Sequence, residues 1–87
     1  MISERMELKV EYKLEDIQIS RNKFTLIIDI QGKVIKYELP IEAYDFLSEI
    51  TPSQRILIVR HTDDYEIYVE WPDLGYGIRL AEFAIVE

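Results

Sequence analysis

The first periodic pattern in the chain is an alternation of apolar and charged residues near the N-terminus. The apolar positions are Met6, Leu8, Val10 and Tyr12. A period of two is typical of a strand with one buried face. Residues 14–20 continue in extended character after a bend, so we expect one N-terminal strand. Residues 1–5, which precede the pattern, are expected to be disordered.

Two apolar segments around Gln31-Gly32 predict a β-hairpin. A two-residue loop at this point pairs Ile28 with Ile35. In this register, six large apolar side chains lie on the same face of the hairpin. Those residues are Phe24, Leu26, Ile28, Ile35, Tyr37 and Leu39. The turn position and the apolar register agree, which supports the hairpin. Glutamine is not a favoured first residue of a type I′ turn, so a slip to a longer loop stays open.

Apolar residues at spacings of three and four predict one amphipathic helix over about residues 41–50. They are Ile41, Ala43, Tyr44, Phe46, Leu47 and Ile50. The helix is expected to end at Thr51, because the residue before Pro52 is disfavoured in the helical region. Acidic residues near its C-terminus oppose the helix dipole, so tertiary packing must hold it.

A second hairpin is predicted for residues 55–71. With Asp63-Asp64 as its loop, Ile58 faces Val69 and Ile56 faces Trp71. Residues 80–86 fit either a closing strand or a short helix. The expected fold is therefore α+β, as one domain over residues 1–87. Its antiparallel sheet consists of the two hairpins and the N-terminal strand, with the helix of residues 41–50 packed on it.

The charge of the chain is unevenly distributed. The 87 residues have a net charge of −7, and the whole excess lies in residues 40–87, where ten acidic residues face three arginines. An acidic surface repels phosphate, so we expect no direct nucleic-acid binding. Two interpretations stay open for the acidic half. It serves solubility alone, or it docks a basic protein partner or imitates nucleic acid.

Composition also bears on the cellular setting. Cysteine is absent, which excludes disulfides and thiolate chemistry. The N-terminus lacks the apolar region of a signal peptide, and no apolar run approaches the roughly 20 residues that span a bilayer. We therefore expect a cytoplasmic protein that does not enter a membrane.

His61 is the only histidine and therefore the first candidate for chemistry. Asp63, Asp64 and Glu66 lie near it, but a hairpin tip favours aspartate for its own backbone hydrogen bonds. Catalytic zinc usually takes three protein ligands in fixed geometry. We expect no catalytic residue, no metal and no cofactor, and a His61–Glu66 contact across the hairpin. The competing hypothesis is a small ligand-binding or enzymatic domain with a pocket near His61 and Trp71.

Tyrosine is abundant, with six copies, and supplies contact area at a low entropy cost. Tyr37 and Tyr44 fall on apolar faces, whereas Tyr68 and Tyr76 have no evident internal role. An exposed face that includes Tyr68 would also favour a homodimer. Within residues 70–79, Pro72 ends a strand and Trp71 caps the core, with its indole N–H expected near solvent. The predicted protein-interface residues are Tyr68, Trp71, Asp73, Tyr76, Asp63, Asp64, Glu66 and Glu70.

Four segments carry a resemblance to known proteins: residues 24–32, 37–39, 46–47 and 66–75. From residue 14 to the end, the chain resembles a family of small bacterial domains of unknown function. That family has the order strand, hairpin with a glycine turn, short helix and hairpin ending in Trp-Pro and a glycine. This chain departs from it by having two residues, Asp73-Leu74, between the proline and the glycine.

The resemblance implies a small, cytoplasmic, non-enzymatic protein of a bacterium or phage, often encoded beside a partner in toxin–antitoxin-like pairs. Some members are fused to a helix-turn-helix. This chain lacks the second helix that such a motif needs to read a DNA groove, so that role is not expected for it. We therefore predict a non-catalytic, acidic protein-binding module. An antitoxin-like protein that docks a basic partner is the leading version, and an inhibitor that imitates nucleic acid is the second.

Overall fold

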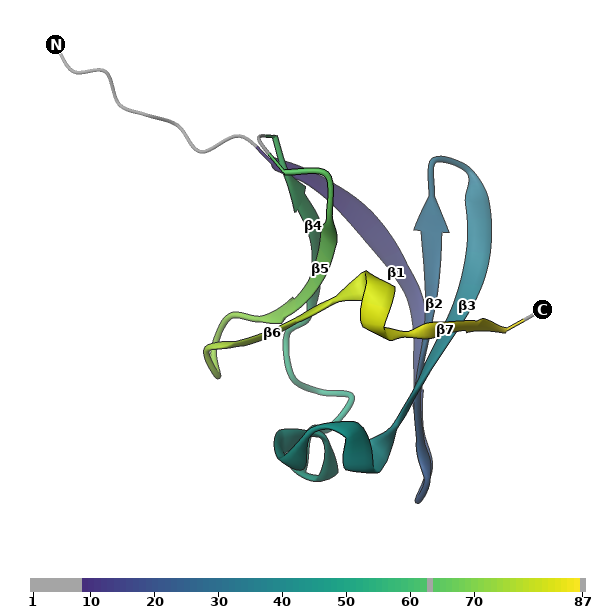
Figure 1. Ribbon diagram of the computed structural model, residues 1–87, viewed down its shortest axis with the longest axis vertical. Coiled ribbons are helices and arrows are strands. Elements are labelled where there is room, and N and C mark those ends of the chain that lie inside the picture. Colours follow the sequence, from purple (N-terminus) through teal and green to yellow (C-terminus); the bar gives the residue numbers. More distant parts are fainter. Residues whose placement is uncertain (1–8, 63, 87) are drawn as a thin grey trace, which may run out of the picture.

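The computed structural model describes residues 9–62 and 64–86. The strands are β1 (Lys9–Ile19), β2 (Lys23–Ile30), β3 (Lys33–Pro40), β4 (Leu57–His61), β5 (Ile67–Trp71), β6 (Tyr76–Arg79) and β7 (Ala84–Val86). Within the described residues they form one antiparallel sheet in the order β6-β5-β4-β1-β2-β3-β7. Figure 1 shows this sheet curving into a half-barrel, with β4 and β5 on one side and β2 and β3 on the other.

Strand β1 belongs to both walls of the half-barrel. Its residues 9–12 pair with β4, whereas residues 13–19 pair with β2. The register shifts between Leu14 and Asp16, which is the position of a β-bulge. Because a bulge bends a strand and increases its twist, this one lets β1 pass from one wall to the other (Figure 1). Met6 and Leu8 of the predicted alternation lie outside the described residues.

The first predicted hairpin is confirmed in its register. Ile28 pairs with Ile35 and Phe24 with Leu39. Gln31 has φ 55° and Gly32 has φ 89°, the left-handed conformations that a type I′ turn requires. The carboxylate of Asp29 accepts a hydrogen bond of 2.8 Å from the backbone N–H of Gly32. The longer loop does not form; it was an alternative because glutamine is not favoured as the first residue of a type I′ turn.

Gln31→Asn is expected to stabilise the protein by about 1 kcal/mol, because asparagine tolerates the left-handed conformation that costs glutamine about 1–2 kcal/mol. The midpoint of urea denaturation should rise accordingly. Lys33→Asn is the matched control, since Lys33 is an exposed strand residue outside the turn. Equal midpoints for Gln31→Asn and the wild type would contradict a strained Gln31.

The predicted α-helix over residues 41–50 is wrong, and so is the α+β class. The segment forms two short 3-10 helices, η1 (Ile41–Ala43) and η2 (Asp45–Glu49), which are separated by Tyr44 in an extended conformation with φ −140° and ψ 135°. Neither has a side-chain cap. A further 3-10 helix is η3 (Leu80–Glu82), and the described residues contain no α-helix. The protein is therefore mostly β.

A helix failed to form because the segment has little intrinsic support for one. Aromatic and β-branched residues lose rotamer freedom in a helix, aspartate and serine compete for the backbone, and an uncapped segment of about ten residues is marginal. Packing selects a different conformation, in which Leu47 and Ile50 are buried. Ala43, which the helical pattern placed on the apolar face, is exposed.

The second hairpin has the predicted register but a longer loop. Ile58 pairs with Val69, as predicted. The strands end at His61 and resume at Ile67, so the connection is longer than Asp63-Asp64, and the ladder begins at Leu57 rather than including Ile56. Asp63 lies outside the described residues.

A third hairpin was not predicted. Residues 76–79 form β6, which pairs with β5 through a turn of residues 72–75. Backbone N–H groups of Leu74 and Gly75 donate to the carbonyl of Trp71 at 3.0 and 2.9 Å, and Gly75 has φ 76°. After it, residues 80–86 contain both alternatives left open by the sequence, η3 followed by strand β7.

The core lies between the two walls. Phe24 of β2 packs against Trp71 of β5, with ring centroids 5.7 Å apart, and against Phe83, 6.2 Å away. Tyr37 meets Phe83 edge-on at 6.5 Å, and burial raises the pKa of Tyr37. The short helices η1 and η2 lie across one end of the half-barrel (Figure 1). No helix among the described residues has the length and apolar character to cross a membrane.

Candidate functional site

Three aromatic rings form a row that joins η2 to the β5–β6 turn. Tyr76 stacks on Phe46 with centroids 4.1 Å apart and an interplanar angle of 11°. Phe46 in turn lies 5.9 Å from Tyr44. We call Tyr44, Phe46 and Tyr76 the aromatic row. It joins segments that are about thirty residues apart in the sequence.

The aromatic row is supported from below and open to solvent above. Trp71 meets Phe46 edge-on, with centroids 5.3 Å apart at 77°. Tyr76 is 46 % exposed and the neighbouring Leu74 is 41 % exposed. Both side chains therefore have apolar surface available for contact. Because the backbone of Tyr44 is extended between η1 and η2, the side chains of both Tyr44 and Phe46 can take part in the row.

Trp71 was predicted as an interface residue, and the structure places it in the core with 0 % exposure. Its ring therefore offers no area to a partner in this conformation. The indole Nε1 is buried, and no described residue gives it a hydrogen-bond acceptor. The sequence had placed this N–H near solvent. Trp71 contributes to the surface only indirectly, because its ring packs against Phe46.

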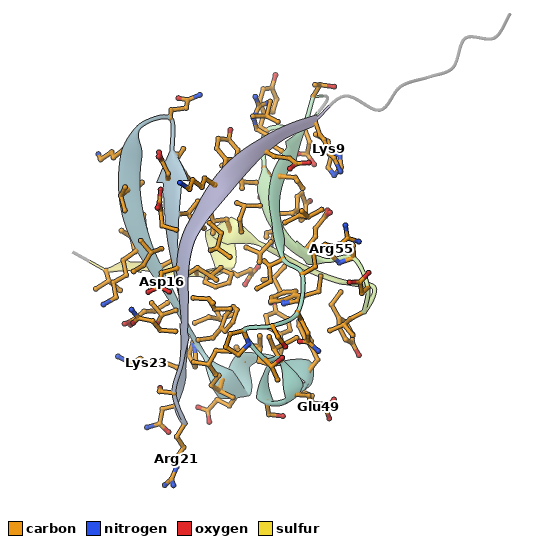
Figure 2. The ribbon with its side chains drawn as sticks, turned by 180° about the vertical axis from the view of Figure 1, so that it is seen from behind. Lys9, Asp16, Arg21, Lys23, Glu49 and Arg55 are labelled. Carbon is orange, nitrogen blue, oxygen red and sulfur yellow. The ribbon has the colours of Figure 1, made fainter. Side chains whose placement is uncertain are left out.

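Asp73 lies at the tip of the β5–β6 turn, next to the aromatic row. Its Oδ1 is 3.2 Å from Nη2 of Arg55, and both side chains are well exposed. Figure 2 labels Arg55 beside this turn. An ion pair exposed to this extent contributes about 0–1 kcal/mol, so Asp73 stays available to a competing cation.

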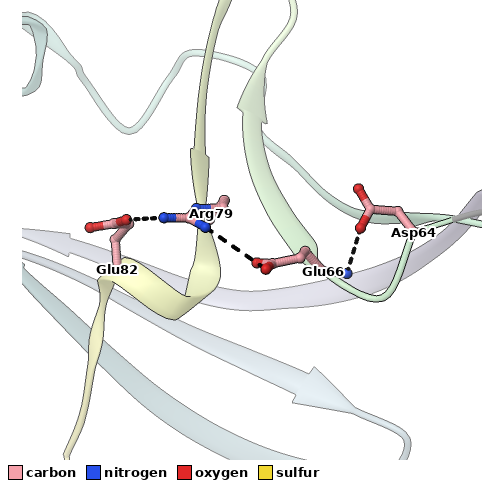
Figure 3. A network of polar contacts seen from close by, with 4 residues as sticks. All are labelled: Asp64, Glu66, Arg79 and Glu82. Carbon is pink, nitrogen blue, oxygen red and sulfur yellow. Dashed lines mark hydrogen bonds and ion pairs between the residues drawn. The ribbon is translucent and has the colours of Figure 1, made fainter.

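Most of the other predicted acidic residues are engaged on the outer face of the sheet. Arg79 donates to Glu82 at 2.7 Å and lies 3.8 Å from Glu66 (Figure 3). The hydrogen bond to Glu82 and the charge of Glu66 raise the pKa of Arg79. The carboxylate of Asp64 accepts a hydrogen bond of 3.0 Å from the backbone N–H of Glu66. These contacts hold the loop and η3 in place.

Nε2 of His61 lies 3.5 Å from Oε2 of Glu70. The sequence predicted a contact with Glu66, whose carboxylate instead faces Arg79. His61 and Glu70 project from the same face of the sheet, because Glu70 pairs with Leu57 and alternate residues of a strand share a face.

The structure divides the predicted interface residues into two groups. Tyr76 pairs with Trp71 and shares the inner face with it. Tyr68 pairs with Arg79 on the outer face, together with Glu66 and Glu70. Tyr76 and Trp71 therefore face the opposite side of the sheet from Tyr68 and Glu70, so the described members of the predicted set do not share one face. Tyr76 and Asp73 lie at the aromatic row, Trp71 lies beneath it, and the outer-face group lies on the other side of the sheet.

The sequence missed the part of this surface that η1 and η2 contribute. Glu42, Asp45 and Glu49 are exposed there, and Glu49 marks this end of the molecule in Figure 2. Phe46 had been assigned to the core face of a helix. The available signal was the closeness of three acidic residues to two aromatic ones within residues 42–49.

A groove adjoins the row at Tyr44. It has a volume of about 460 Å³. The residues that line it come from the β1–β2 turn and from η1 and η2, and they are Arg21, Asn22, Ile41, Glu42, Tyr44, Asp45 and Ser48. Its walls therefore combine one aromatic ring, two carboxylates and one guanidinium.

Two other cavities lie away from this surface. One, of about 500 Å³, lies beside η3 and β7 and includes Tyr37, Phe83 and Ile85. The other, of about 260 Å³, includes Leu39 and Pro40. None of these three cavities has His61 or Trp71 in its walls. Residues 9–62 and 64–86 contain no cluster of three or more histidine or acidic side chains that could hold a metal ion.

Comparison with protein-family models, with curated proteins and with solved structures found no match. The function is therefore inferred from the fold and from this surface.

Proposed function

We propose that the protein is a non-catalytic binding module that docks a basic protein partner through the aromatic row and the acidic residues around it. The observation that carries the proposal is the Phe46–Tyr76 stack at 4.1 Å, which has a buried tryptophan beneath it and an exposed tyrosine face above. Aromatic side chains held rigidly over a packed support are typical of binding hot spots, because little entropy is lost when they are covered.

Charge specifies the kind of partner. Glu42, Asp45 and Glu49 belong to η1 and η2, and Asp73 belongs to the β5–β6 turn, so all four lie on or beside the segments that carry the row. Of these four, only Asp73 has an ion pair within the described residues. Acidic residues at the rim steer a basic partner and disfavour an acidic one. Lysine or arginine side chains can also lie against tyrosine and phenylalanine rings.

An antitoxin-like pairing is the leading version of this proposal, and an inhibitor that imitates nucleic acid is the second. The family resemblance described above is the reason for this order. A cytoplasmic location is part of the proposal, because a chain without cysteine needs no oxidising compartment to fold.

The proposal is tested by placing the photocrosslinker p-benzoylphenylalanine at position 76 in cells that naturally produce the protein. A covalent adduct with one basic protein is expected after irradiation. Position 34 is the matched control, since Val34 is 58 % exposed but belongs to β3. Adducts that form equally from both positions would contradict the proposal, as would an adduct at position 76 with only a second copy of the chain.

The partner identified in this way allows a quantitative test. Tyr76→Ala is expected to weaken its binding at least about 30-fold, the effect of losing about 2 kcal/mol at a hot spot. Tyr65→Ala serves as the control, because Tyr65 is fully exposed and lies outside the row. Isothermal titration calorimetry measures both. Equal affinities of the two variants would argue against the aromatic row as the contact.

A further inference from the structure

The groove beside Tyr44 contains two carboxylates without partners. Within residues 9–62 and 64–86, neither Glu42 nor Asp45 makes a side-chain hydrogen bond or an ion pair, although Arg21 lines the same groove. The groove therefore presents more negative than positive charge, and both of its acidic side chains are available to a cation from outside.

The backbone around the groove is fixed by its own hydrogen bonds. The N–H of Ile41 donates to the carbonyl of Asn22 at 3.0 Å, which joins η1 to the β1–β2 turn. The hydroxyl of Ser48 donates to the carbonyl of Asp45 at 3.1 Å within η2. A groove whose walls are joined in this way needs little ordering when a side chain enters it, which lowers the cost of binding.

The groove also continues the docking surface. Tyr44 lines the groove and is the last ring of the aromatic row, 5.9 Å from Phe46. A partner that covers Tyr76 and Phe46 therefore reaches Tyr44 next, and then the two carboxylates.

We propose that this groove receives an arginine side chain of the partner, with its guanidinium against the ring of Tyr44 and paired with Glu42 and Asp45. The inference rests on the proposed function, since it specifies what the partner brings to one end of the aromatic row. A guanidinium suits the site because it is planar, stacks on aromatic rings and donates two parallel hydrogen bonds to a carboxylate. A lysine ammonium is a more strongly hydrated point charge and uses this combination less well.

The test is a ¹H–¹⁵N NMR titration of the whole chain with the capped peptide Ac-Gly-Arg-Gly-Arg-Gly-NH₂ and with its lysine counterpart. The arginine peptide is expected to shift the amides of residues 41–48, and to bind several-fold more tightly than the lysine peptide. The double variant Glu42→Gln/Asp45→Asn should weaken arginine binding about tenfold or more. Both carboxylates are exposed and make no side-chain hydrogen bond or ion pair within the described residues, so this variant should keep its fold.

The double variant Glu11→Gln/Glu15→Gln is the matched control, because it removes the same charge from exposed positions of β1. It should leave the affinity nearly unchanged. Arg21→Ala should increase the affinity about two- to threefold, the effect of removing one competing surface charge. A purely structural role for Glu42 and Asp45 would not produce this increase.

The inference is overturned if the two double variants bind the arginine peptide equally, or if the lysine peptide binds as tightly as the arginine peptide. The experiments distinguish failure of this inference from failure of the proposed function. If the groove variant binds the crosslinked partner as well as the wild type does, while Tyr76→Ala does not, docking through the row stands without the arginine groove. Loss of crosslinking at position 76 would instead remove the docking surface itself.

Discussion

Trp71→Ala is expected to lower the free energy of unfolding by about 3–5 kcal/mol, a large part of the stability of a domain this small. The side chain is fully buried and contacts rings from both ends of the core, Phe24 at 5.7 Å and Phe46 at 5.3 Å. Deleting it leaves a cavity among these rings. Urea denaturation followed by far-ultraviolet circular dichroism measures the change without relying on the lost tryptophan.

Trp71→Phe is the control for that result. It keeps an aromatic ring between Phe24 and Phe46 and removes the buried Nε1–H, which has no acceptor among the described residues. An unsatisfied buried donor costs about 1–3 kcal/mol, so its removal offsets part of the lost packing. We expect a net loss below about 1.5 kcal/mol. Equal losses for the two variants would show that ring packing at this position is not what stabilises the core.

Phe24→Ala is expected to have the second largest effect, a loss of about 3–5 kcal/mol in the free energy of unfolding. Phe24 is fully buried in β2 and contacts Trp71 of the opposite wall as well as Phe83 beside β7. Its removal therefore separates the two walls as well as opening a cavity. Thermal unfolding by calorimetry measures the loss and also reports whether a single transition remains.

Phe24→Leu and Val34→Ala are the controls for this prediction. The leucine variant keeps most of the apolar volume and should lose clearly less stability than the alanine variant. Val34 belongs to the neighbouring strand β3 but is 58 % exposed, so its truncation should change stability by no more than about 0.5 kcal/mol. A Phe24→Ala variant as stable as Val34→Ala would contradict the role of Phe24 in joining the walls.

The parts of the fold that could be predicted are those set by local pattern. The hairpin at Gln31-Gly32 follows from alternating apolar residues on both sides of a glycine turn, and its register agrees residue by residue. The pairing of Ile58 with Val69 follows from the same kind of pattern. Alternation fixes which face is buried, so a strand signal of this kind survives in the tertiary structure.

The parts that could not be predicted depend on packing between distant segments. The spacing of residues 41–50 fits a helix, but Tyr44 is extended, and Phe46 stacks on Tyr76, which lies thirty residues further along the chain. Strand β6 has only four residues and contains Gly77, so it resembles the continuation of a turn. Without β6, the sequence could not show that Tyr76 and Tyr68 lie on opposite faces.

The candidate site was therefore only partly within reach of the sequence. Tyr76 could be selected because it lacked an evident internal role, whereas Trp71 has 0 % exposure. Phe46 and Tyr44 were assigned to the core because a helix would have buried them. Their partial exposure follows from the break between η1 and η2.

The passage of β1 from one wall to the other also has a consequence for the order of folding. Strands β1, β2 and β3 are successive neighbours, and so are β4, β5 and β6, so each set can assemble through short hairpin loops. The two sets meet where Tyr12 pairs with Ile58 and Lys9 with His61. Closing that long loop loses more chain entropy than any hairpin does. The β1–β4 pairing, together with the β3–β7 pairing that also joins segments far apart in the sequence, is thus expected to form after the hairpins.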